Sequence, residues 1–362
     1  MPRSHMPTMR TMLRRHLPGP MLRLVQRARA RMRRAGASYV SRLEQEQRNF
    51  AACETVHDLP PIFHYWSNRY LRPMLERFGF DHPDAFFVRS LYAQQRVDGE
   101  GPRRFASLGS GNCDTEIRIA AALRERGCTA FVIDCIDVNT DMLDRGQRDA
   151  EAAGLSTHLV PVCADFNHWK PATRYDAVMA NQSLHHVLEL EHLFDTVRRT
   201  LDAGGCFVVS DMIGRNGHLR WPEARTIVER FWKELAPPYR YNHQLQRHED
   251  SFLDWDCSVG GFEGIRAQDI LPLLVERFTF DEFIGFGNVI DPFVDRSFGP
   301  NFDLARPDDL AFIDRVHAAD EEALAGGVVK PTHMFAVMRA GGSAATRHLP
   351  GLSPTQSIRW PD

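Results

Sequence analysis

Several features that would assign this chain to a class of protein are missing from its sequence. Across its 362 residues no apolar run approaches the roughly 18 residues that span a bilayer, so we do not expect an integral membrane protein. The seven cysteines stand singly and form no CxxC pair, which argues against a zinc ribbon and against a disulfide framework. We therefore expect reduced thiols and a cytoplasmic location.

Acidic side chains are absent from the first 40 residues, which contain ten arginines. Removing this charge of +10 from the formal total of −3 leaves −13 for the rest of the chain. A body with that charge repels phosphate groups, so we expect no nucleic-acid partner. Because arginines interrupt every apolar stretch of the segment, it does not have the pattern of a secretory signal peptide.

Two interpretations of this basic arm, residues 1–40, stay open. If it is helical, Met21, Leu24 and Val25 share one face and arginines occupy the others, which suits peripheral contact with anionic lipid. A solvated, flexible tail explains the same composition.

Short apolar runs alternate with longer helical patterns between residues 104 and 211. We predict strands at "RFASLG", "AFVIDCIDV", "HLVPVCADF", "YDAVMAN" and "GGCFVVSDMI", with helices over 114–126, 140–153 and 189–201. Such alternation predicts right-handed crossovers and a doubly wound, mostly parallel α/β sheet.

The rest of the chain flanks this core. We predict a helical cap over 41–103, a lid or substrate insertion over 212–266, and a C-terminal part of the core over 267–341. That last part comprises a helix over 267–276, a strand "FTFDEFIGFG", a second insertion through Gly327 and a final strand "THMFAVMRA". Residues 342–362 are predicted to be a flexible tail.

The turn after the first predicted strand contains two glycines, Gly109 and Gly111, at the sheet edge where open α/β folds bind ligands. Glycine lets the backbone turn sharply and approach a ligand closely. The dinucleotide pattern has a third glycine where this chain has Asp114, and a carboxylate there repels a pyrophosphate. A ligand without phosphates is therefore favoured over NAD(P) or FAD.

The ends of the next strands supply further polar groups. Asp137 can accept hydrogen bonds from the hydroxyls of a ribose, and Asp165 can accept one from an adenine amino group while Phe166 lies against the ring. Asn181 and Ser183 follow the fourth strand and enter the same pocket. An adenosine that bears an amino acid in place of phosphate uses all of these groups.

The order "SLGSGNCDTE", "CIDVNTDML", "CADF", "YDAVMANQSLHHVLELEHLF" and "LDAGGCFVVSDMIG" resembles the class I S-adenosylmethionine-dependent methyltransferases. The resemblance covers about residues 104–211 and implies a seven-stranded sheet that ends in an antiparallel hairpin. It also implies S-adenosylmethionine as cofactor, with Gly109 and Gly111 under the methionine moiety, Asp137 on the ribose, and Asp165 with Phe166 at the adenine.

The chain departs from that family at two positions near the expected methionine ammonium group. Many members have an acid where this chain has Ser107, and many have glycine where it has Cys113.

Two adjacent histidines, His185 and His186, follow the fourth strand beside the expected methyl group. We predict that one of them, His185 in preference, acts as a general base, although capping the helix or supporting the cofactor site explains them equally well. Asp211, at the end of the fifth strand, either faces the pocket or caps a turn. His192 with neighbouring acids reads as a helix surface, and we expect no metal.

The less regular segments offer aromatic and polar side chains for choosing an acceptor. Candidates are Tyr239, His243 and Asp256 in the insertion and Tyr65 and Trp66 in the cap, and each equally fits an ordinary packing role.

Three hypotheses about function follow. The first is an S-adenosylmethionine-dependent methyltransferase acting on oxygen or nitrogen of a small molecule, with a saccharide or a glycolipid intermediate as a candidate acceptor. The second is a non-catalytic methyltransferase-like binding or assembly protein, suggested by Ser107 and Cys113. The third, an NAD(P)-dependent oxidoreductase, is disfavoured by Asp114. The oligomeric state does not follow from the sequence.

Overall fold

The computed structural model describes residues 39, 42–43, 59–94, 101–259, 261–342 and 345–360. Apart from Tyr39, the predicted basic arm lies outside these residues, as does most of the predicted cap before residue 59. None of the described helices is both long enough and apolar enough to cross a membrane. The six cysteines in the described part of the chain are free thiols.

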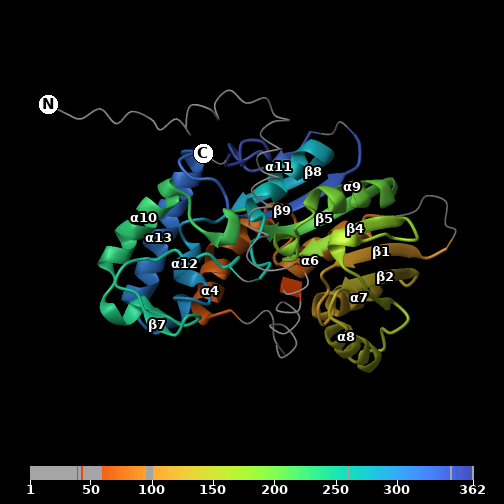
Figure 1. Ribbon diagram of the computed structural model, residues 1–362, viewed down its shortest axis with the longest axis horizontal. Coiled ribbons are helices and arrows are strands. Elements are labelled where there is room, and N and C mark those ends of the chain that lie inside the picture. The colour runs from red at the N-terminus through yellow and green to blue at the C-terminus, as the bar shows by residue number, and fades with distance from the viewer. Residues whose placement is uncertain are drawn as a thin grey trace.

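Eight strands form one sheet in the order β10-β8-β9-β5-β4-β1-β2-β3 (Figure 1). Their bounds are β1 Arg103–Leu108, β2 Phe131–Asp137, β3 Leu159–Cys163, β4 Tyr175–Asn181, β5 Leu201–Met212, β8 Thr279–Phe286, β9 His333–Arg339 and β10 Arg347–His348. Strand β9 is antiparallel to both of its neighbours, and the other neighbouring pairs of this sheet are parallel. The prediction of a doubly wound, mostly parallel α/β sheet is confirmed.

The sheet has one strand more than the seven predicted, because the C-terminal segment adds β10 to the edge beside β8, where His348 pairs with Phe283. Residues beyond β10 also pack onto the core, since Leu352, Ser357 and Ile358 are buried. The sequence predicts a flexible tail over residues 342–362, and the structure differs from that prediction at β10 and at these buried residues. The polar, proline-containing sequence of this segment gives no hint of these contacts.

Helices cover both faces of the sheet and bury two separate cores. One face packs against α6 (Pro83–Tyr92), α7 (Asp114–Glu125) and α8 (Thr140–Ala152). The other packs against α9 (Leu190–Thr200) and α11 (Ala267–Arg277). Helix α9 turns its buried residues, among them Leu193, Phe194 and Val197, toward the sheet at helical spacing, which is why this segment folds as a helix rather than as a strand.

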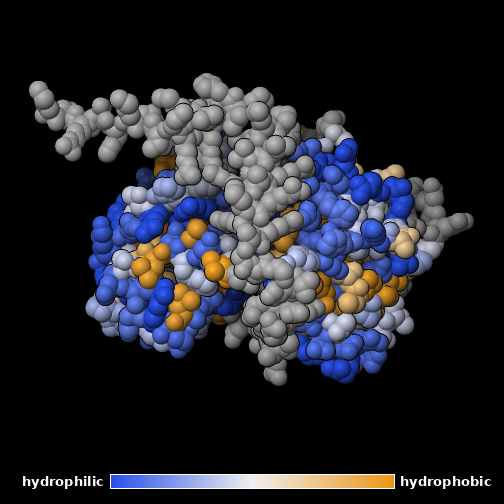
Figure 2. Space-filling model, viewed as in Figure 1, coloured by the Kyte–Doolittle hydropathy of each residue, from blue (hydrophilic) through white to orange (hydrophobic). Residues whose placement is uncertain are grey.

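A third core lies outside the sheet, in a layer that we call the lid. The lid comprises α4 (Pro61–Trp66), α10 (Pro222–Glu234), α12 (Asp291–Val294) and α13 (Pro307–Ala325), which gather on one side of the sheet (Figure 1). Short elements join these helices: the π-helical turn η2 (Ser67–Leu71), α5 (Arg72–Glu76), η6 (Pro237–Arg240), η7 (Gly299–Asn301) and the strand pair β6 (Tyr241–Asn242) and β7 (Arg247–His248). On the face in Figure 2, hydrophobic side chains appear in small separate groups among hydrophilic ones.

Candidate functional site

The glycine turn after β1 has the conformation that its sequence predicts. Gly109 and Gly111 have φ angles of +75° and +51°, a region where glycine has no steric cost. A Cβ atom on Gly109 would lie 2.4 Å from the Cβ of Ser183, so no larger residue fits there. The Gly111 N–H donates to Asp137 Oδ2 at 2.9 Å, which fixes the turn against the end of β2.

The two departures from the family pattern are compensated in different ways. Cys113 keeps a left-handed backbone, with φ of 60°, in place of the expected glycine. At position 107 the hydroxyl of Ser107 donates to Glu116 Oε1 at 2.5 Å, which brings an acidic side chain of α7 next to Ser107. Burial raises the pKa of Glu116 to about 7. Glu116 Oε2 is buried and has no hydrogen-bond partner among the described residues.

Asp137 lies at the carboxyl end of β2, as predicted, and is half-buried. Its carboxylate accepts from the N–H groups of Gly111 and Asn139, both at 2.9 Å. Burial nevertheless raises the pKa of Asp137 above its ordinary value, more than these hydrogen bonds lower it.

Asp165 and Phe166 follow β3, and Phe166 opens the short helix η3 (Phe166–His168). Asp165 Oδ2 accepts from the hydroxyl of Tyr39 at 2.6 Å and lies 2.9 Å from His168 Nδ1. Burial opposes ionisation here, but these hydrogen bonds outweigh it and hold the pKa of Asp165 below its ordinary value. Tyr39 lies 126 positions earlier in the chain, and no sequence pattern predicts its contact with this carboxylate.

The end of β4 completes the cofactor side of the site. Asn181 is half-buried, and its amide lies 3.5 Å from the hydroxyl of Thr115 at the start of α7. Ser183 is buried and donates to the carbonyl of Leu108 at 2.7 Å, which ties the β4 loop to the glycine turn. The structure thus brings together the loops that carry Gly109, Asp137 and Asn181 at one edge of the sheet.

His185 belongs to the short helix η4 (Leu184–His186) and is held from behind by Asp211. Its Nδ1–H donates to Asp211 Oδ1 at 2.7 Å, which leaves Nε2 directed away from that carboxylate. Asp211, fully buried, also accepts from the N–H groups of Ser183 and Leu184, at 2.9 and 2.7 Å. Asp211 therefore caps the turn after β4 and orients an imidazole at once.

Glu263, which the sequence did not single out, faces the histidines from the loop before α11. Its carboxylate lies 3.4 Å from His185 Nε2 and 3.4 Å from His186 Nε2, and it accepts from His218 Nε2 at 2.6 Å. His218 ends the short helix η5 (Asn216–His218) at the start of the insertion. We call His185, His186, His218 and Glu263 the histidine cluster.

Charges within the histidine cluster stabilise one another. Burial opposes protonation of His185, but Asp211 and Glu263 outweigh it and raise the pKa of His185 to about 10. Burial would raise the pKa of Glu263, yet the facing His185 ring and the hydrogen bond from His218 hold it well below its ordinary value. Desolvation lowers the pKa of His218.

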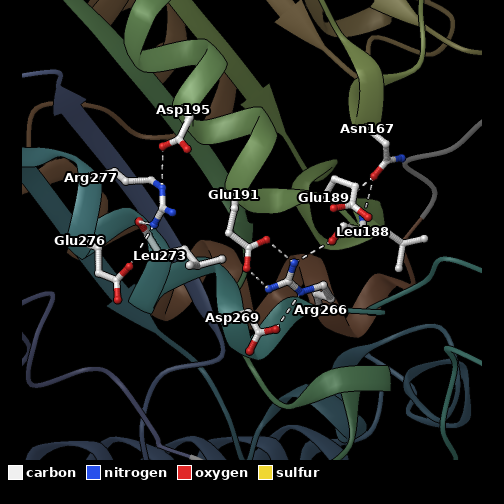
Figure 3. Close-up of polar contacts among 10 residues, drawn as sticks. All are labelled: Asn167, Leu188, Glu189, Glu191, Asp195, Arg266, Asp269, Leu273, Glu276 and Arg277. Carbon is white, nitrogen blue, oxygen red and sulfur yellow. Dashed lines mark hydrogen bonds and ion pairs between the residues drawn. The ribbon is translucent and has the colours of Figure 1, made fainter. Parts of the chain in front are cut away.

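Arg266, three residues after Glu263, makes the polar contacts with Glu191, Asp269 and Leu188 that Figure 3 shows. Its buried guanidinium donates to both carboxylate oxygens of Glu191, to Asp269 and to the carbonyl of Leu188. One residue earlier, the Ile265 N–H donates to the carbonyl of His185 at 3.1 Å. These contacts pin the loop to α9 and η4, so Glu263 keeps its place beside the imidazoles.

Several predicted acceptor residues instead hold the lid together. The hydroxyl of Tyr239 donates to Asp309, the hydroxyl of Tyr65 donates to Asp314, and His243 contacts Asn301. Trp66 is buried in the third core. No signal in the sequence pointed to Glu263 or His218, whose neighbours in the chain are glycines and apolar residues.

Residues 107–205 match the family model described as a methyltransferase domain. The search of curated sequences found no match.

Among solved structures, the StiE O-MT is 13% identical, with a TM-score of 0.41, and the match covers 79% of this chain and 83% of that one. Geranyl diphosphate C-methyltransferase from Streptomyces coelicolor is 14% identical, with a TM-score of 0.38, covering 70% and 77%. The [4+2]-cyclase SpnF is 19% identical, with a TM-score of 0.39, covering 71% and 82%.

Replacing Arg266 by Met should reduce the free energy of unfolding by about 3–5 kcal/mol, because it removes the ion pairs of Arg266 with Glu191 and Asp269, which are only 20% and 14% exposed. Arg277→Met, on the same helix, is the matched control. Its partners Asp195 and Glu276 are 48% and 39% exposed, and we expect a loss below about 1 kcal/mol. Urea denaturation of both variants checks this, and equal losses would contradict the assignment of Arg266 as the anchor.

Glu116→Gln should change how stability depends on pH. With its pKa raised from 4.5 to about 7 on folding, wild-type Glu116 keeps its proton in the folded state while the unfolded state loses it, so stability falls as pH rises from about 4.5 to 7. The variant cannot lose that proton. Relative to wild type it should therefore gain up to about 3 kcal/mol between pH 4.5 and pH 8. Urea denaturation across this range measures the difference, and parallel curves would show that Glu116 is not the group responsible.

Proposed function

We propose that this chain, a class I S-adenosylmethionine-dependent methyltransferase, transfers its methyl group to an oxygen or nitrogen atom of a small molecule, with oxygen the first choice. The observation that carries the proposal is the histidine cluster at the carboxyl edge of the sheet, tied through Asp211 to the turn that closes over Gly109. When bound, S-adenosylmethionine supplies a methyl group activated by a positively charged sulfur.

The residues on the cofactor side fit this molecule. The glycine turn lies directly after β1, at the carboxyl edge of the sheet where open α/β folds bind ligands, and its glycines let the backbone approach a ligand closely. We assign Gly109 and Gly111 to the methionine moiety and Asp137 to the ribose. Asp165 and Phe166 are assigned to the adenine, and Asn181 to the wall of the pocket.

At the acceptor end we place His185 and His186, with Glu263 opposite. A hydroxyl is a weak nucleophile until its proton is removed, whereas a neutral amine can attack before it loses a proton, so a cluster of imidazoles and carboxylates favours an oxygen. We assign His186 as the group that accepts the hydroxyl proton, while His185, whose pKa is raised to about 10, keeps its own proton and stabilises the negative charge on the oxygen. Fixing two reactants in this way supplies much of the rate acceleration of such a displacement.

The acceptor we favour is a saccharide or a glycolipid intermediate. The loop that leads to Glu263 exposes the apolar side chains of Leu253, Trp255 and Val259. Apolar groups beside a polar cluster suit an acceptor that has a hydroxyl at one end and an apolar part at the other.

The cofactor site is tested by titrating the purified protein with S-adenosylmethionine and S-adenosylhomocysteine. Asp137→Ala should weaken both by about 10- to 100-fold, because it removes charged hydrogen bonds to the ligand and loosens the Gly111 turn. Asp141→Ala, an exposed acid in the first turn of α8, is the matched control and should bind as wild type does. Equal affinity of wild type and Asp137→Ala would remove Asp137 from the site.

The acceptor atom is tested with labelled S-adenosylmethionine and pairs of acceptors that differ in one hydroxyl. Label should enter the hydroxylated saccharide or glycolipid and not its deoxy partner. His186→Ala should slow the transfer by about 100-fold or more with cofactor affinity unchanged, while His192→Ala, outside the cluster, should not. Label on carbon, or equal labelling of the deoxy compound, would refute oxygen as the methylated atom.

A further inference from the structure

We propose that His185, His186 and Glu263 form a binding site for a divalent first-row metal ion, of which Zn²⁺ is the simplest case. One ligand atom from each residue lies within 4.8 Å of the other two. Two imidazoles and a carboxylate are a donor set that proteins use for such ions.

Two of the separations between ligand atoms match those of a tetrahedral site, each through a different oxygen of Glu263. With metal–ligand bonds of about 2.0–2.1 Å, neighbouring ligand atoms lie about 3.3–3.4 Å apart. Glu263 lies 3.4 Å from His185 Nε2 through Oε1 and 3.4 Å from His186 Nε2 through Oε2. These separations exceed the usual length of a charged hydrogen bond, about 2.7–2.9 Å. The carboxylate thus faces both rings without closing on either.

Groups behind the ligands already orient them. Asp211 accepts the Nδ1 proton of His185, the arrangement by which a second carboxylate sets a ligand imidazole with Nε2 toward a metal. His218 donates to Glu263 Oε1 at 2.6 Å and fixes that carboxylate from the other side. Arg266 and the bond from Ile265 to His185 hold the Glu263 loop in register.

The site is closed on one side and open on the other. The side chain of His185 is 5% exposed, whereas that of Glu263 is 38% exposed. Three protein ligands with an open position are typical of catalytic rather than structural metal sites. In the fourth position the ion would bind the acceptor's oxygen and lower the pKa of its hydroxyl. This catalytic role rests on the proposed function, but the binding of the ion does not.

The metal site is not the one that the sequence brought to attention. His192 faces the carbonyl of Trp169, and Glu191 is paired with Arg266. Glu263 reaches the adjacent histidines from a loop 77 positions beyond His186, so sequence spacing could not reveal the set.

Metal binding is tested without any acceptor or cofactor. Untagged protein stripped with EDTA is titrated with Zn²⁺ by calorimetry and with Co²⁺ by visible absorption. We expect one ion per chain and the intense absorption of tetrahedral Co²⁺. Glu263→Gln and His186→Ala should each weaken binding by more than 100-fold, and His218→Asn, behind the ligand, by about 10- to 100-fold. His192→Ala should bind as wild type does.

Binding of S-adenosylhomocysteine serves as the check that each variant is folded. Absence of a stoichiometric ion in wild type, or wild-type affinity in a folded Glu263→Gln variant, would overturn the metal site. Neither result bears on methyl transfer, which the labelling experiment decides separately.

Discussion

The Asp211 carboxylate is the constraint on which the site depends. It is fully buried at the end of β5, and it accepts from two N–H groups of the β4 loop and from the His185 ring. A buried carboxylate is costly unless its lone pairs are satisfied, so the loop has few alternatives to this conformation. Through Ser183, the same loop closes over the glycine turn. One side chain therefore couples the glycine turn to the histidine cluster.

The histidine cluster is assembled from residues that lie far apart in the sequence. His185 follows β4, His218 begins the insertion after β5, and Glu263 ends it. Arg266 makes this assembly rigid, because its ion pairs with Glu191 and Asp269 tie the end of the insertion to two helices of the core. The insertion is thus anchored at both ends beside the histidine cluster, and its middle, which includes α10, packs in the lid.

The sequence predicted the sheet well because its strands and helices carry strong local periodicity. It also predicted Asp137 and the glycine turn, since both sit at fixed positions relative to strand ends. Glu263 could not be predicted, because the loop before α11 has no periodicity and its partner lies far along the chain. The contacts of Tyr39 with Asp165 and of Glu116 with Ser107 could not be predicted either. In the sequence, Asp165 and Ser107 stand as single residues, and only the fold brings their partners to them.

The third core limits how segments can be exchanged between this chain and related proteins. It is built from the segment before β1, the insertion after β5 and the stretch between β8 and β9, so Trp66, Phe231, Phe293 and Phe312 meet although none is close to another in sequence. A chimaera that receives only one of these segments from a related protein would therefore contain only part of this core. Preserving this core requires exchanging all three segments together, so the lid behaves as one structural unit although its residues are spread along the chain.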